Sequence, residues 1–324
     1  MNQQINLQYT TIQQPVPGFI YENLLPFIRK SNAYHPQPKE LIVKLSQKHQ
    51  LPENYFFLTA GIDEAIQMII RKFGDETHIF TPTYGVYNDA KIFGKKVIAH
   101  NSLGDHHYEI IPKQYRSASL IFIANPNNPC GETDQEVIRE IITKNPQAIT
   151  VVDEAYADFV NYSMIADVDK YINLAVMRSF SKSYGLAGFR LGFIATQPQI
   201  IEKIAPMTQW ANVAYVSVGA SLTALDYESY FSKMRQELMK LKHDFVTFLT
   251  DQKFPVIPTK TNAVLLHFTS ENKAREFVDH LHNHEIIVNH GDGNSTIGLD
   301  KRFVRITIGT HDQMNYVKKI ISTF

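Results

Sequence analysis

One short segment around Lys182 carries the residue types best suited to covalent chemistry. Residues 172–177 are predicted to form a buried strand, and Lys182 follows among serines, with Arg190 eight positions later. A lysine at the polar end of an apolar strand loses its proton more readily than a surface lysine, because partial burial disfavours the ammonium. It can then form an imine with an aldehyde. Ser179, Ser181 and Arg190 are donors suited to a phosphate, which the guanidinium can bind through two hydrogen bonds.

Two further apolar runs end in polar groups. The run 120–124 enters a loop whose two prolines restrict Asn128, and the run 149–152 ends at Asp153. A carboxylate directly after an apolar strand is costly unless a cation pairs with it. A protonated pyridine nitrogen is one such cation, and capping of the following segment is the structural alternative.

The elements that must position these groups alternate as strand, loop and helix through residues 55–200. This pattern predicts a mainly parallel sheet that is buried on both faces. In such sheets ligands bind beyond the carboxyl ends of the strands, which is where Asn128, Asp153 and Lys182 stand. The sequence therefore predicts one site built from several strand ends.

Two more positions favour anions. The helix after Gly61 offers backbone N–H groups and the positive end of its dipole, although any capped helix does the same. Arg305 stands within the apolar strand 303–308, so its fixed charge needs an anion. That anion is either a substrate or a structural ion-pair partner.

Composition limits the other classes of function. The 324 residues carry 32 basic and 32 acidic side chains, so no basic surplus predicts a nucleic-acid partner. The single cysteine, Cys130, excludes an internal disulfide and fits a reducing compartment. No signal peptide is visible and no apolar run approaches the ~20 residues of a membrane span, so we expect a cytoplasmic protein without a membrane partner. His280, His282 and His284 are spaced by two on a predicted helix and cannot share a face, so no metal site is expected.

The lysine segment, Ser-x-Ser-Lys-x-x-Gly-Leu-x-Gly-x-Arg-x-Gly at 179–192, resembles that of the fold-type I pyridoxal-phosphate (PLP) enzymes. The similarity is greatest to the histidinol-phosphate aminotransferase branch and spans roughly 34–310. It implies an α/β PLP-dependent transferase fold with a mainly parallel large-lobe sheet and a small α/β C-terminal lobe. The expected domains are an N-terminal arm (1–33), a large PLP-binding domain (34–225) and a small domain (226–324) joined by a long helix.

The resemblance also implies the roles of residues at the cofactor. Lys182 would bind PLP covalently, and the PLP phosphate would meet the backbone amides of Gly61 and Ile62 and the side chains of Ser179, Ser181 and Arg190. Around the ring, three further contacts are expected. Tyr84 would lie against the pyridine, Asp153 would pair with its nitrogen, and Asn128 and Tyr156 would share its phenolic oxygen.

Two residues are assigned to the substrate and to a second subunit. By the same resemblance Arg305 would hold the substrate α-carboxylate. Tyr34 would reach the PLP phosphate of the neighbouring subunit in a homodimer with shared active sites. The alternative for Tyr34 is that its ring packs on its own chain.

The predicted activity is transfer of an amino group between an amino acid, or an amino-phosphate such as histidinol phosphate, and a 2-oxo acid. Lys182, Asp153 and Tyr84 are the predicted catalytic residues, with Lys182 moving the proton as general base and acid. The main alternative is PLP-dependent decarboxylation of the threonine-phosphate decarboxylase type. Two other functions are disfavoured. A PLP-sensing regulator would need a DNA-binding domain, for which this sequence has no spare residues. A nicotinamide enzyme would need a glycine-rich motif that Gly291-Asp292-Gly293 does not form.

Two departures from the resembled branch concern the substrate. Asn289 follows Ile286-Ile287-Val288, where histidinol-phosphate enzymes usually carry an arginine for the substrate phosphate. The N-terminal arm also lacks their Asn-Glu-Asn-Pro run. A smaller departure, Cys130 in place of a common threonine, leaves the prediction for Asn128 intact.

Overall fold

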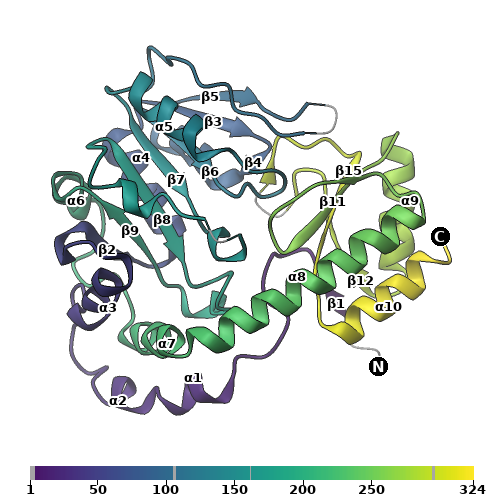
Figure 1. Ribbon diagram of the computed structural model, residues 1–324, viewed down its shortest axis with the longest axis horizontal. Helices are drawn as coiled ribbons and strands as arrows, with labels where there is room; N and C mark the ends of the chain where they lie inside the picture. The colour runs from purple at the N-terminus through teal and green to yellow at the C-terminus, as the bar shows by residue number, and fades with distance from the viewer. Residues whose placement is uncertain (1–3, 105–106, 161, 294–295) are drawn as a thin grey trace.

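The computed structural model describes residues 4–104, 107–160, 162–293 and 296–324. Its largest element is a seven-stranded sheet, seen towards the upper left of Figure 1. The strands run, from one edge to the other, as β2 (Phe56–Thr59), β9 (Gly192–Thr196), β8 (Leu174–Ser179), β7 (Ile149–Asp153), β6 (Leu120–Ala124), β3 (Glu76–Thr81) and β5 (Lys96–Asn101). Strand β9 pairs antiparallel with both β2 and β8, and the other pairs of neighbouring strands are parallel. The predicted mainly parallel sheet is confirmed, with its lysine-bearing strand beginning at Leu174 rather than at residue 172.

Alternation of apolar side chains buries both faces of this sheet. In β6, Ile121 and Ile123 join one core while Leu120 and Phe122 join the other. The helices on the first face are α3 (Lys39–His49), α5 (Gln135–Lys144) and α7 (Tyr215–Asp226), and those on the second are α4 (Gly61–Phe73) and α6 (Pro198–Ile204). Because both faces are covered, the open ends of the strands are where a ligand can reach the sheet.

The C-terminal part forms a smaller sheet with its own apolar core (Figure 1, green to yellow). Its antiparallel strands follow the order β10 (Val256–Ile257), β11 (Ala263–His267), β15 (Phe303–Thr307) and β13 (Asn289–His290). The helices that pack on it are α8 (Glu228–Asp251), α9 (Glu271–His282) and α10 (His311–Ile321). A further two-residue strand, β12 (Ile286–Ile287), lies just before β13 in the sequence. The 24-residue α8 runs from the larger sheet to the smaller one, as the apolar stripe of the long helix predicts.

From the sequence, the N-terminal arm was expected to be an irregular segment with one short helix. In the structure it is more ordered. Its strand β1 (Ile5–Asn6) pairs in parallel with β12, and two short helices follow, α1 (Gly18–Glu22) and α2 (Leu25–Ile28). Leu7 is fully buried in the core of the smaller sheet. Its first three residues lie outside the described part of the chain. The arm is therefore attached to the C-terminal lobe, to residues 281 positions further along the sequence.

A second short pairing joins the two lobes. Strand β14 (Thr296–Ile297) pairs antiparallel with β4 (Thr83–Tyr84), which directly follows β3. Among the described helices none combines the length and apolar character needed to cross a membrane. Within the same residues no three His, Cys, Asp or Glu side chains gather as a metal site would require.

Candidate active site

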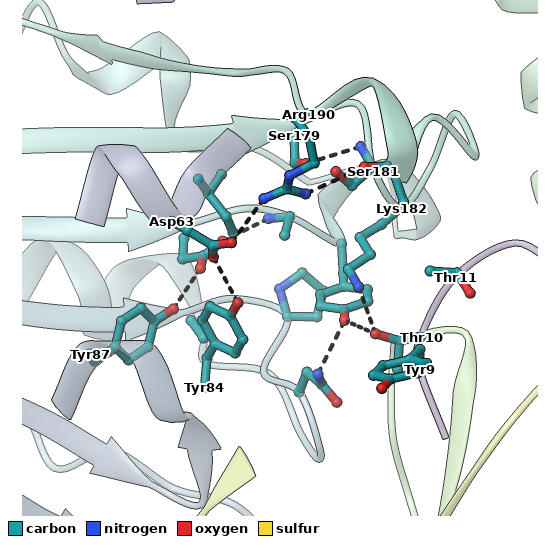
Figure 2. A pocket seen from close by; sticks show the side chains of 18 of the residues that line it. Tyr9, Thr10, Thr11, Asp63, Tyr84, Tyr87, Ser179, Ser181, Lys182 and Arg190 are labelled. Atoms are coloured by element: carbon teal, nitrogen blue, oxygen red, sulfur yellow. Dashed lines mark hydrogen bonds and ion pairs between the residues drawn. The ribbon is translucent and has the colours of Figure 1, made fainter. Parts of the chain in front are cut away.

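A cavity of about 230 Å³ opens beyond the carboxyl ends of β6, β7 and β8. Its lining side chains come from these strand ends, the N-terminus of α4, the arm and β15, among other segments. Figure 2 shows most of them from close by. Ten predicted site residues line it: Ile62, Tyr84, Asn128, Asp153, Tyr156, Ser179, Ser181, Lys182, Arg190 and Arg305. The strand-end argument therefore predicts the location of the cavity correctly.

Lys182 lies at one end of a chain of hydrogen bonds. Its Nζ donates to Thr10 Oγ1 at 2.9 Å and lies 5.8 Å from the centre of the Tyr156 ring. Thr10 Oγ1 is in turn 2.6 Å from the Tyr156 hydroxyl, which also accepts from Asn128 Nδ2 at 3.1 Å. The amide oxygen of Asn128 accepts from Arg305 at 3.0 Å. One network thus joins the lysine to the arginine.

Asp153 is a buried carboxylate without an ion-pair partner in the described part of the chain. Only 4% of the residue is exposed, and it accepts from the Tyr87 hydroxyl at 2.6 Å and from the Ala155 N–H at 3.0 Å. Burial raises the pKa of Asp153 to about 6, against the opposing effect of both hydrogen bonds and of the positive charge of Lys182. A cationic ligand would remove this cost.

Arg305 is the complementary case, a buried cation facing the same cavity. It is 2% exposed, and its guanidinium donates to Asn128, to Thr296 Oγ1 at 2.9 Å and to the Gln8 carbonyl at 2.9 Å. All of these acceptors are neutral, and Arg305 Nε makes no hydrogen bond. Burial lowers the pKa of Arg305 from its usual value. The arrangement leaves a positive charge available to an anion in the cavity.

The opposite end of the cavity is formed by the start of α4. Gly61 has φ +76°, a conformation that favours glycine, and a Cβ atom there would lie 2.8 Å from Arg190 Nη2, so the guanidinium would have to shift. Arg190 Nη2 donates to Asp63 Oδ2 at 2.9 Å, and the Tyr84 hydroxyl donates to Asp63 Oδ1 at 2.7 Å. Figure 2 shows Ser179 and Ser181 close to Arg190. Burial, followed by the negative charge of Asp63, raises the pKa of Tyr84.

Two predicted residues, Gly61 and Tyr34, are not among those that line the cavity. Gly61 directly precedes the lining residue Ile62. Tyr34 is 81% exposed, and its ring lies 5.9 Å from that of Trp210, which is also exposed. Packing on its own chain would bury the phenol. The proposed role across an interface is taken up below.

Sequence reasoning missed five lining residues with polar side chains: Tyr9, Thr10, Thr11, Asp63 and Tyr87. Two of them had a local signal. Asp63 follows Gly61 and Ile62 in the predicted anion-binding turn, and Tyr87 lies three residues after Tyr84, in the 3-10 helix Gly85–Phe93. The three arm residues had none, because their position depends on a pairing with β12.

These groups fit PLP. A phosphate matches the end formed by the α4 N-terminus, Ser179, Ser181 and Arg190, and a pyridinium matches the carboxylate of Asp153. Lys182 supplies an amine for an aldehyde. An α/β fold that collects a lysine, a buried carboxylate and an anion-binding helix end at one cavity defines the class of PLP-dependent enzymes.

Comparisons with known proteins agree with this class. The chain matches the family Aminotransferase class I and II over residues 29–321 and belongs to it. It is 29% identical to a histidinol-phosphate aminotransferase of Geotalea uraniireducens, over 92% of this chain and 93% of that protein. The predicted fold, family, aminotransferase activity and PLP cofactor are thereby confirmed.

Two solved structures show the same fold. One is the histidinol-phosphate aminotransferase of Clostridium acetobutylicum, with a TM-score of 0.88, 20% identity and coverage of 98% of both chains. The other is the L-threonine-O-3-phosphate decarboxylase of Porphyromonas gingivalis, with a TM-score of 0.85, 23% identity and coverage of 99% of both chains. At these identities the likeness establishes the fold and leaves the reaction to the site.

Proposed function

We propose that the protein moves an amino group between an amino acid and a 2-oxo acid, with Lys182 as its catalytic lysine. The observation that carries the proposal is that one cavity contains Lys182, the unpaired carboxylate of Asp153 and the guanidinium of Arg305 with neutral partners only. Buried charges that lack partners in the chain are expected to find them in a ligand.

The cofactor phosphate would be bound by the N–H groups of Gly61 and Ile62 and by Ser179, Ser181 and Arg190. Arg190 already donates to Asp63, so the phosphate would share or replace that contact. When bound, PLP supplies two groups: an aldehyde that condenses with amines, and a cationic ring that accepts an electron pair from the substrate.

The remaining side chains would act on the ring and on the reacting proton. Asp153 would hold the ring nitrogen in its cationic form, while Tyr84 would pack against the ring and Asn128 and Tyr156 would donate to its phenolic oxygen. Lys182, released when a substrate amine takes its place, would move the proton at the substrate Cα as general base and acid.

Arg305 would orient the substrate through its carboxylate. The position that carries an arginine in the resembled histidinol-phosphate enzymes is here Asn289, which is buried and donates to the Gly291 carbonyl. We therefore propose an amino acid with an α-carboxylate as the principal amine. Histidinol phosphate, named for the relative above, is the second candidate, and its phosphate would then need Arg305.

The test is a panel of amino donors with 2-oxoglutarate, including histidinol phosphate and threonine phosphate. Purified protein loaded with PLP should show an absorption band that borohydride abolishes, and the productive donor should bleach it. Lys182→Ala should lose the reducible adduct and at least about 10⁴-fold in turnover. Retention of the same adduct by Lys182→Ala would refute the role of this lysine, and release of CO₂ without amino transfer would indicate the decarboxylase.

We also propose that the active unit is a homodimer in which Tyr34 binds the PLP phosphate of the neighbouring subunit. The exposure of Tyr34 and Trp210 supports this proposal, since two adjacent exposed aromatic rings suit an interface. Tyr34→Ala should weaken PLP binding without changing the fold of its own chain.

A mixture of two inactive variants tests the shared site. A mixed dimer of Tyr34→Ala and Lys182→Ala contains one site free of both changes, so activity should partly return once subunits exchange. If the subunits exchange and no activity returns, Tyr34 acts within its own chain and not at the site of the neighbouring subunit.

A further inference from the structure

The arm delivers one hydroxyl, that of Thr10, directly to the amine of Lys182. Thr10 is 4% exposed, and its Oγ1 accepts from Lys182 Nζ at 2.9 Å and lies 2.6 Å from the Tyr156 hydroxyl (Figure 2). A threonine hydroxyl has one proton and two lone pairs. Thr10 can therefore accept from Lys182 and still share a second hydrogen bond with the Tyr156 hydroxyl, in which either oxygen can be the donor. The Tyr156 oxygen also accepts from Asn128.

The position of Thr10 is set by the residues before it. Ile5 and Asn6 pair with β12, the Leu7 N–H donates to the Ile287 carbonyl at 2.7 Å, and the Leu7 carbonyl accepts from the Thr307 N–H at 3.0 Å. The next carbonyl, that of Gln8, accepts from Arg305. The segment is therefore held by the C-terminal lobe up to two residues before Thr10.

We propose that Thr10 is a positioning residue that holds the free amine of Lys182 while this amine moves the substrate proton. The inference rests on the proposed function. An amine on a four-carbon stem has many rotamers, and its hydrogen bond to a buried, anchored hydroxyl selects the one that faces the cavity. The same arm contacts Arg305 through Gln8, so a single stretch of backbone aligns the group for the proton and the group for the substrate.

The experiment compares Thr10→Val, which keeps the shape and removes the hydroxyl, with Thr10→Ser, which keeps the hydroxyl. Thr150→Val is the matched control, because Thr150 is fully buried in β7, does not line the cavity and has a hydroxyl without a hydrogen-bond partner. Thr10→Val should lower kcat about 10- to 100-fold with little change in KM. Its isotope effect with substrate deuterated at Cα should rise, because proton transfer becomes slower. Thr10→Ser and Thr150→Val should stay close to wild type.

A second measurement does not depend on turnover. In the cofactor-free protein the labelling rate of Lys182 by an amine-directed reagent, read by mass spectrometry, should change in Thr10→Val and not in Thr10→Ser. PLP affinity should stay within about threefold in all variants. Unchanged kcat, isotope effect and labelling in Thr10→Val would overturn the inference. The inference would also be overturned if Thr10→Val weakened PLP binding and raised KM to a similar extent, because that result indicates a structural role. A wild-type protein that forms no reducible adduct would instead overturn the proposed function, and the inference with it.

Discussion

Two aspartates five residues apart, Asp153 and Asp158, meet opposite surroundings. Asp158 accepts from the Arg178 guanidinium and from Ser183 Oγ at 2.6 Å. Burial alone would raise its pKa, but Arg178 and Ser183 hold the pKa of Asp158 below its usual value. Asp153 has a tyrosine and a backbone N–H instead of a cation, and burial raises its pKa to about 6. The same side chain is paired in one place and left for a ligand in the other.

The cavities beside these aspartates differ in the same way. The cavity next to Asp158 is the larger, about 740 Å³, against about 230 Å³ for the one lined by Asp153. In the larger cavity, however, Arg178 bonds Glu154 at 2.9 Å as well as Asp158, and Arg235 bonds Glu228. Its charges are compensated within the chain. Uncompensated buried charge, rather than volume, therefore distinguishes the cavity that we propose as the active site.

Among the substitutions that test this contrast between the two aspartates, Asp153→Asn should have the largest effect, which is on turnover. Turnover should fall by about 10³-fold or more, because the ring nitrogen loses its anionic partner, while much of the PLP stays bound through its phosphate. Steady-state rates and the absorption spectrum of the loaded variant measure the two effects separately.

Asp158→Asn is the matched control for this change. It should lower the free energy of unfolding by about 1–3 kcal/mol, because Arg178 loses one of its two carboxylates. Turnover per folded molecule should stay near wild type. If Asp153→Asn also keeps near-normal turnover, Asp153 is merely a structural acceptor for Tyr87 and Ala155.

Arg305→Ala should have the next largest effect. KM for an amino-acid substrate should rise about 10- to 100-fold, because a charge-assisted pair with the carboxylate is lost. An amine without a carboxylate should be affected much less. Equal losses for both substrates would show that Arg305 acts by holding Asn128 and Gln8 in place.

How much of this contrast could be read from the sequence depends on distance along the chain. The strands β6, β7 and β8 are apolar runs followed by polar residues, so both their existence and the position of Asp153 beyond them are local properties. The strands that the sequence did not reveal, such as β1 and β14, have two residues each and exist only through pairing with distant partners.

The same limit applies to the site. Lys182 and Arg190 belong to one segment and were predicted together, whereas the contact of Arg190 with Asp63 joins two segments 127 residues apart. Thr10 reaches Lys182 over 172 residues, from an arm whose composition carries no strong structural signal. Residues in a local motif were therefore predictable, and residues brought in by long-range pairing were not.

The smallest effect concerns Tyr87, which donates to Asp153 and stacks on Phe122 with ring centres 4.6 Å apart. An acid whose folded-state pKa is raised from 3.8 to about 6 keeps its proton in the folded state while the unfolded chain has lost it. Stability of the cofactor-free protein should therefore fall as pH rises from about 4 to 6, by at most about 3 kcal/mol from this group, and then level off. Tyr87→Phe removes a hydrogen bond that lowers the pKa of Asp153. It should extend the fall to higher pH and reduce stability at pH 7 by a further ~1 kcal/mol.

The double variant Tyr87→Phe with Asp153→Asn separates this titration from lost packing. With no carboxyl group at position 153, Tyr87→Phe should change stability by the same amount at pH 4 and at pH 7. Chemical denaturation at both pH values gives the free energy of unfolding of four cofactor-free proteins: the wild type, the two single variants and the double variant. Together they form a double-mutant cycle. A coupling free energy between Tyr87→Phe and Asp153→Asn that is equal at both pH values would show that Tyr87 only fills space beside Phe122. A coupling that grows with pH is expected, because the Tyr87 hydroxyl stabilises the ionised form of Asp153, the form that the bound cofactor needs.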